Sequence, residues 1–147
     1  YYLNGKLHRE DGPAIIEYFD NDNNEIVSYY LNGKLHREDG PAIIEYFDNG
    51  NKNKKHYYFN GKLHRENGPS EIWYYKNGNV NFEEYWYNGV CHKEDGPAEI
   101  WYYKNDGFIE KEKYYFNGIE FKPEELSFKM PIDNPEKIFM FKLKYGE

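Results

Sequence analysis

Apolar and polar positions alternate in two short runs that return along the whole chain. One run is PAIIEYFD at 13–20, and the other is EIVSYYLN at 25–32. Both runs are rich in Ile and Tyr, which favour extended backbone, and both are bounded by Asn-Gly or Asp-Gly pairs. The pattern predicts two strands in each unit, joined by tight hairpin turns, and no helical period before 123–126.

Alternation along the first run assigns its side chains to the two faces of a sheet. One face keeps a small residue, an Ile and a Tyr in every copy: Ala14, Ala42, Ser70, Ala98, Ile16, Ile44, Ile72, Ile100, Tyr18, Tyr46, Tyr74 and Tyr102. The other face is mixed and changes between copies: Ile15, Ile43, Glu71, Glu99, Glu17, Glu45, Trp73, Trp101, Phe19, Phe47, Tyr75 and Tyr103. We expect the first set to form the packed face and the second to lie nearer to solvent.

The two runs belong to a longer repeat that starts with YYLNGKLHREDGP. Copies begin at Tyr1, Tyr29, Tyr57 and Tyr85, spaced by 28 residues, and a broken copy begins at Tyr114. A fixed period of this length is typical of a stacked array. The prediction is therefore an all-β fold: an elongated antiparallel β-meander or solenoid of about five hairpin repeats over 1–118, which advances about 10 Å per repeat.

Residues 119–147 depart from the repeat and are predicted to form a C-terminal cap. They contain proline breaks, a short helix candidate that begins at Pro123, and an alternating strand KIFMFKLKY at 137–145. Lysines on an edge strand block further pairing, and nothing comparable protects the edge at Tyr1. We therefore expect either a monomer or edge-to-edge self-association through the N-terminal edge.

Composition adds three constraints. Aromatic residues make up 20% of the chain while all hydrophobic residues make up 39%, which suits a thin sheet whose rings are half hydrated. The net charge of −7, with no basic stripe, excludes a nucleic-acid partner and disfavours a membrane surface. The single cysteine, Cys91, occupies the slot of Leu7, Leu35 and Leu63, so it is predicted to be a buried apolar side chain of a cytoplasmic protein.

The block YYxNGKLHxEdGPAxxxYYxNG resembles the MORN repeat, with an aromatic–Asn-Gly entry, a basic residue, a corner and a strand. It is most similar to divergent MORN-like repeats of bacterial antitoxin-like proteins and of large DNA viruses of amoebae. The corner, HREDGP, and the longer period depart from the common motif. The resemblance implies an extended β-hairpin array that mediates contacts between proteins or with membranes, and it brings no catalytic residues.

The corner carries a repeated His-x-Glu: His8, His36, His64 and His92 with Glu10, Glu38, Glu66 and Glu94. A metal or acid–base site is one reading. Copies about 10 Å apart cannot share an ion whose ligands lie about 2 Å from it, and one pair offers too few ligands. We therefore expect a structural corner and no metal or cofactor, with the His packed on a neighbouring Tyr and hydrogen-bonded to backbone, and with the acids accepting N–H bonds in the turn.

Nucleophilic catalysis has little support in the sequence. The chain holds three serines, Ser28, Ser70 and Ser127, and no threonine. None of the serines stands in a Gly-x-Ser-x-Gly elbow. Every distinctive feature is repeated, whereas catalytic sites are single, so the chain is predicted not to be an enzyme.

Aromatic residues recur at two strand positions and form a candidate binding strip: Tyr2, Tyr30, Tyr58, Trp86, Tyr115, Trp73 and Trp101. The same rings also stabilise a thin sheet through cross-strand pairs, and that reading is preferred. The first functional hypothesis is a non-catalytic scaffold for protein–protein interaction with an unknown protein partner. The alternative is a carbohydrate- or cell-wall-binding array, because aromatic hairpin repeats of cell-wall-binding proteins are similar.

Overall fold

The structure is a computed structural model that describes residues 1–19 and 24–122. All regular secondary structure in these two ranges is β-strand. The predicted helix at Pro123, the predicted strand at 137–145 and most of the predicted cap lie outside the described residues.

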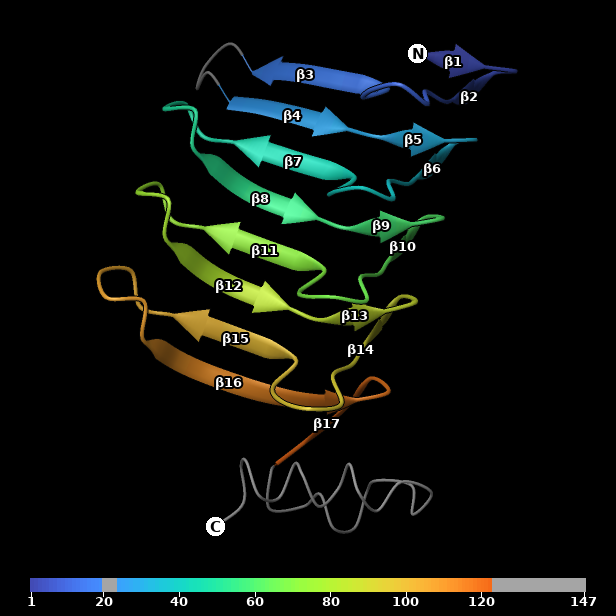
Figure 1. Cartoon of the computed structure of the whole chain (residues 1–147). Coiled ribbons are helices and arrows are strands. Elements are labelled where there is room, and N and C mark those ends of the chain that lie inside the picture. The colour runs from blue at the N-terminus through green and yellow to red at the C-terminus, as the bar shows by residue number, and fades with distance from the viewer. Residues whose placement is uncertain (20–23, 123–147) are drawn as a thin grey trace.

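Nine strands form one large sheet in which every neighbouring pair is antiparallel (Figure 1). Its order is β17-β16-β15-β12-β11-β8-β7-β4-β3, so neighbours in the sequence are mostly neighbours in space. The strands are β3 (Ile15–Phe19), β4 (Asn24–Ser28), β7 (Ile43–Tyr46), β8 (Lys52–His56), β11 (Glu71–Tyr74), β12 (Val80–Glu84), β15 (Glu99–Tyr102), β16 (Ile109–Phe116) and β17 (Ile119–Phe121). The prediction of an all-β, antiparallel fold is confirmed.

Four small two-stranded hairpins line one side of the large sheet (Figure 1). They are β1 (Tyr2–Leu3) with β2 (Lys6–Leu7), β5 (Tyr30–Leu31) with β6 (Lys34–Leu35), β9 (Tyr58–Phe59) with β10 (Lys62–Leu63), and β13 (Trp86–Tyr87) with β14 (Val90–Cys91). Each hairpin turns at an Asn-Gly pair, and in the second both residues have positive φ, 52° at Asn32 and 80° at Gly33. This is the geometry that the Asn-Gly signal predicts.

The run at 25–32 was predicted as one strand, and that prediction is wrong. The strand ends at Ser28, although the Tyr29 N–H still donates to the Ala42 carbonyl, 2.8 Å away and in the register of β4 with β7. Tyr30 then pairs with Leu35 inside the hairpin. Each unit therefore has two long strands and one small hairpin.

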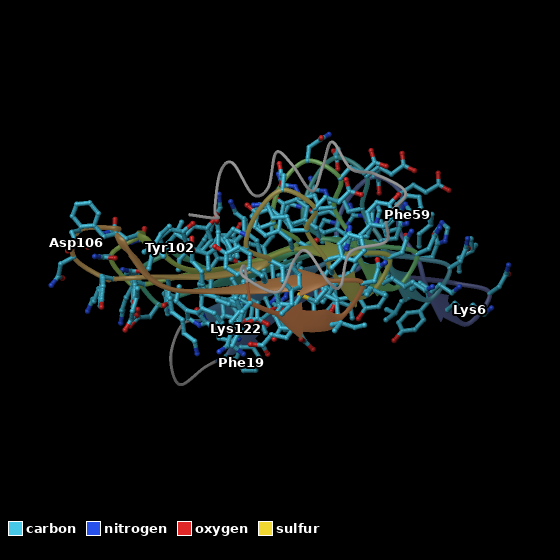
Figure 2. The ribbon with its side chains drawn as sticks, turned by 90° about the horizontal axis from the view of Figure 1, so that it is seen from below. Lys6, Phe19, Phe59, Tyr102, Asp106 and Lys122 are labelled. Atoms are coloured by element: carbon cyan, nitrogen blue, oxygen red, sulfur yellow. The ribbon has the colours of Figure 1, made fainter. Side chains whose placement is uncertain are left out.

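Backbone hydrogen bonds join each hairpin to the next one. The Gly33 N–H donates to the Leu7 carbonyl at 2.7 Å, and the Arg9 N–H donates to the Tyr30 carbonyl at 3.0 Å. Viewed along the stack, the sheet is a thin layer with the hairpin residue Lys6 at one end and the turn residue Asp106 at the other (Figure 2). Such a layer is stabilised mainly by contacts between adjacent units.

The predicted difference between the two faces holds only in part. Ala42, Ala98, Ile72 and Ile100 are buried, as expected of the packed face. On the opposite face, however, Phe82 is buried, and the side chains of Glu71 and Glu99 are only 14% and 13% exposed. The assignment of Glu71 and Glu99 to solvent is therefore wrong. The hairpin residue Tyr58 lies near Glu71, and Tyr115 lies near Glu99, close enough for each carboxylate to add to the increase in pKa that burial causes in its neighbouring phenol.

The first unit is the exception on the packed face. Ile16 is 46% exposed and Tyr18 is 71% exposed, although their counterparts Ile44 and Tyr46 are half-buried. These residues lie on β3, which is the terminal strand of the sheet, and no described strand pairs with its outer edge.

Candidate functional site

The corner histidines connect successive units. Nδ1 accepts the backbone N–H of the Asn-Gly turn one unit further on: His8 from Asn32 at 3.2 Å, His36 from Asn60 at 3.1 Å, His64 from Asn88 at 3.1 Å and His92 from Asn117 at 3.0 Å. The rings of His36, His64 and His92 also pack on the aromatic side chain before that turn, each at 4.8 Å between centroids. The predicted backbone bond exists, but it reaches the next unit. The predicted ring contact with a tyrosine occurs at His64, which packs on Tyr87, whereas His36 and His92 pack on phenylalanines.

In three of the four corners the glutamate of His-x-Glu faces the other ring nitrogen. Nε2 lies 3.4 Å from Glu10 at His8, 3.7 Å from Glu38 at His36 and 3.9 Å from Glu94 at His92. Because a backbone N–H can only donate, Nδ1 must carry the lone pair and Nε2 the proton in these corners. Neither nitrogen then presents a free lone pair to a metal, and the glutamates pair with a ring, not with turn N–H groups as predicted.

The basic residue of the corner stacks on the first tyrosine of its own unit. The guanidinium carbon of Arg9 lies 4.0 Å from the Tyr1 ring centroid, and Lys93 occupies the same place over Tyr85 at 3.8 Å. Arg9 Nε also donates to Asp11 at 2.8 Å, which lowers the pKa of that carboxyl. The cation is therefore held beneath the corner by a ring and a carboxylate.

The carboxylates point outward. The side chains of Glu10 and Glu38 are 80% and 79% exposed, whereas those of Arg9 and Arg37 are 26% and 24% exposed. Between two successive corners lies an open groove of about 650 Å³ whose walls carry Arg37, Glu38, Asp39, Phe59, His64 and Glu66. The corners thus present negative charge and keep their positive charge inside. We use the name corner row for the segments 8–13, 36–41, 64–69 and 92–97.

The structure divides the predicted aromatic strip into two groups. Tyr2 is exposed at the end of the array, whereas Tyr30, Tyr58, Trp86 and Tyr115 are half-buried. Trp73 and Trp101 lie on the large sheet and flank Phe82, with ring centroids 5.5 and 4.9 Å apart. Lys54 and Lys111 lie over these two indoles at 4.8 and 4.9 Å. A sugar that stacked on either ring would compete with a lysine for the covered face.

Three glutamates meet side by side on the large sheet. Cross-strand pairing places Glu71 opposite Glu84, and Glu84 opposite Glu99. His56 Nδ1 approaches Glu71 at 3.3 Å at one end, and Lys113 Nζ approaches Glu99 at 3.9 Å at the other. Glu84, in the middle, has no described cation at ion-pair distance. We call Glu71, Glu84 and Glu99 the acid row.

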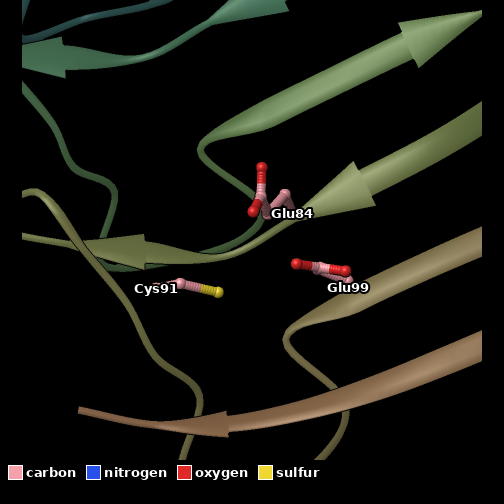
Figure 3. A group of neighbouring side chains, drawn as sticks. All are labelled: Glu84, Cys91 and Glu99. Carbon is pink, nitrogen blue, oxygen red and sulfur yellow. The ribbon is translucent and has the colours of Figure 1, made fainter. Parts of the chain in front are cut away.

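The hairpins bring a thiol and an indole to the acid row. Figure 3 shows the Cys91 Sγ directed toward the carboxylates of Glu84 and Glu99, and one donor atom from each lies within 4.8 Å of the others. The Nε1 of Trp86 is buried without a hydrogen bond of good geometry, although its N–H lies near enough to Glu84 to lower the pKa of that carboxyl. Within the described ranges, this is the one mixed group of carboxylates and a thiol with metal-ligand spacing.

Burial dominates the ionisation of this group. Desolvation is the largest cause that raises the pKa of Glu84 from 4.5 to about 7, and the neighbouring Glu71 and Glu99 raise it further. Desolvation raises the pKa of Cys91 to about 12, and the carboxylates of Glu84 and Glu99 contribute to this increase. The thiol is protonated at neutral pH, so a zinc ion would have to displace protons from both residues to bind.

Sequence reasoning identified the corners and missed the acid row. Cys91 was correctly predicted to be buried, at 7% exposure. Glu84 gave no signal of its own in the sequence, because its strand differs in every copy. Only the cross-strand register brings Glu84 between Glu71 and Glu99.

The serines form no nucleophilic site with an exposed hydroxyl in the described residues. Ser28 and Ser70 are buried, and the Ser70 hydroxyl donates to the Trp86 carbonyl at 2.8 Å. Ser127 lies outside the described residues.

Comparison with protein-family models and with curated proteins finds no match to this chain. In the part of the chain that the structure describes, there is no helix with the length and apolar character needed to cross a membrane.

Proposed function

We propose that this protein is a non-catalytic scaffold, a solenoid of five MORN-like repeats that binds protein partners through its corner row. The observation that carries the proposal is the corner itself. Ring stacking, an ion pair and a bond to the next unit hold its cation and histidine in place, while its carboxylates remain exposed. A rigid, regularly spaced surface of this kind suits recognition better than chemistry.

The charge of the corner row indicates the partner. Glu10, Asp11, Glu38, Asp39, Glu66, Glu94 and Asp95 are all exposed along it. The basic side chains of the same corners are half-buried and engaged with tyrosines. The partner is therefore expected to be a protein segment rich in Lys and Arg, and its association should weaken as salt screens the charges.

A matched pair of double variants tests this proposal. Glu38→Gln with Glu66→Gln removes two carboxylates beside the corner groove, and Glu17→Gln with Glu110→Gln removes two exposed carboxylates elsewhere. Both variants change the net charge equally. Exposed charge pairs contribute about 0.2–1 kcal/mol each, or about 0.4–2 kcal/mol for two, so the corner variant should bind a labelled lysine-rich peptide about two- to thirtyfold more weakly than the control variant.

Fluorescence anisotropy at two salt concentrations measures these affinities. Equal affinities for the two variants would refute corner recognition and leave only a net-charge effect. Titration with cell-wall oligosaccharides, followed by tryptophan fluorescence, tests the carbohydrate alternative. Saturable sugar binding that is lost on Trp73→Ala would favour that alternative over the scaffold.

A further inference from the structure

An exposed ring lies between the second and third corners of the array. Phe59 is 41% exposed, and its ring centroid lies 4.8 Å from that of His36 and 6.0 Å from that of His64. The groove of about 650 Å³ between these corners carries this ring together with Glu38 and Glu66. It therefore combines aromatic surface with carboxylates, which suits a peptide that has both apolar and basic residues.

The third corner offers the groove a donor and an acceptor. Nδ1 of His64 accepts the Asn88 N–H, so Nε2 carries the proton. In the other three corners a glutamate lies at ion-pair distance from this nitrogen. Within the described ranges, no carboxylate lies that close to His64 Nε2, and no cation lies that close to Glu66. The imidazole can therefore donate to a carbonyl oxygen of a ligand, and Glu66 can pair with its cation.

The corners follow one another at a constant spacing. The backbone N–H of each basic corner residue donates to the hairpin of the next unit: Arg9 to Tyr30, Arg37 to Tyr58, Arg65 to Trp86 and Lys93 to Tyr115. The corners therefore advance with the sheet, by two strands in each unit. Because neighbouring strands lie about 4.7–4.9 Å apart, successive corner glutamates are about 9.4–9.8 Å apart.

A polyproline II segment has the matching repeat. It rises about 3.1 Å per residue with three residues per turn, so every third side chain lies on the same side at intervals of about 9.3 Å. An α-helix returns to one side after about seven residues, or about 10.5 Å, and would lose register by about 1 Å at each corner. Residues three apart in a β-strand point to opposite sides.

The chemistry of the groove agrees with this spacing. The carbonyls of polyproline II have no internal hydrogen bonds, so one of them is free to accept the proton of His64 Nε2. Proline-rich segments in this conformation dock on aromatic-lined grooves in other recognition domains, and Phe59 supplies such a ring here.

We propose that the corner row binds a polyproline II segment of the partner protein that carries a basic residue at every third position. The basic side chains pair with glutamates of successive corners, and a proline packs on Phe59. The inference rests on the proposed function, because it uses the same surface, and it adds the conformation and the spacing of the partner.

Two peptides of identical composition test the spacing against the whole chain. KPPKPPKPPKPP has a lysine at every third position, whereas only two of the four lysines of KKPPPPKKPPPP fall on that period. Both carry the same fluorescent label, and binding is measured by fluorescence anisotropy at low salt. Since two charge pairs are lost, the second peptide should bind about two- to thirtyfold more weakly.

A substitution at Phe59 tests the ring. The second unit carries Leu31 at the same position, so Phe59→Leu is compatible with the repeat. It should weaken binding of KPPKPPKPPKPP by about two- to tenfold. The matched control is Phe108→Leu, in the loop between β15 and β16 at the end of the strands opposite the hairpins, which should leave binding unchanged (Figure 1).

The outcomes separate this inference from the proposed function. Equal affinities of the two peptides, with binding still weakened by Glu38→Gln and Glu66→Gln, would overturn the spacing and leave corner recognition intact. Tighter binding of an α-helical peptide with lysines seven residues apart, or equal effects of Phe59→Leu and Phe108→Leu, would overturn the polyproline II conformation. Failure of every lysine-containing peptide to bind would refute corner recognition itself.

Discussion

Replacement of Glu84 by Gln should make the protein more stable at pH 8 and leave its stability at pH 4.5 nearly unchanged. Glu84 lies between Glu71 and Glu99 on adjacent strands, so its charge is desolvated and repelled from both sides. Glutamine keeps the shape of the protonated acid and never acquires the charge. The substitution therefore removes the cost of ionising Glu84 without removing the side chain.

The sign and size of this change in unfolding free energy follow from the difference between the pKa values of Glu84 in the folded and unfolded states. The folded protein raises the pKa of Glu84 to about 7 from 4.5, so between these values the folded state keeps a proton that the unfolded chain releases. Stability then falls as the pH rises through this window and levels off above it. At 1.36 kcal/mol per pH unit the full cost is about 3 kcal/mol. The carboxyl is only half-buried, so solvent screening reduces the expected gain in Glu84→Gln to about 1–2 kcal/mol at pH 8.

The assay is denaturant unfolding followed by tryptophan fluorescence from pH 4.5 to 8.5. Trp86, one of the three tryptophans of the chain, lies beside Glu84. Glu110→Gln is the matched control, because Glu110 is exposed. Carboxylates such as Asp11 and Asp39, whose pKa values are lowered, titrate equally in all three proteins and cancel in the difference. A difference between Glu84→Gln and the parent that is the same at pH 5 and pH 8 would refute the reasoning.

Four further predictions concern packing, the thiol, metals and the tail. Ile72→Ala should lower the free energy of unfolding by about 2–5 kcal/mol, whereas Ile16→Ala on the exposed terminal strand should lower it by less than half as much. Equal losses in the two variants would contradict stabilisation by packing between adjacent units. Cys91 should react with a thiol reagent at pH 8 only at the rate of unfolding, and fast labelling of the folded protein would contradict its burial and its raised pKa. Chelation by EDTA should leave the melting temperature unchanged, and a clear decrease would indicate an ion at the acid row or the corners. Removal of residues 123–147 should cause self-association in light scattering, and a monomer of unchanged melting temperature would show that this segment is not a cap.

The sequence predicted those parts of the fold that depend on local chemistry. Asn32 and Gly33 adopt positive φ because that pair favours the tight turn, and Cys91 is buried because it takes the place of a leucine. The break at Tyr29 was not predictable from alternation, since it depends on Tyr30 pairing with Leu35 in the hairpin instead of continuing beside β7.

The candidate site shows the same division. His36 was expected to bond to backbone, but its partner, Asn60, belongs to the next unit and is set by the offset between hairpins. The acid row was missed because Glu71, Glu84 and Glu99 come from three strands, and only the register places them together. Contacts between residues far apart in the sequence therefore determine the features of the site that could not be predicted.

The repeated His-x-Glu is expected to be a structural connection between units and not a chemical site. Scalar coupling across hydrogen bonds, measured by NMR between the Asn60 amide nitrogen and His36 Nδ1, tests this expectation. We expect a measurable coupling, a proton on Nε2, and the same result for Asn88 with His64 and Asn117 with His92. A proton on Nδ1, or ring signals that shift when zinc is added, would contradict it.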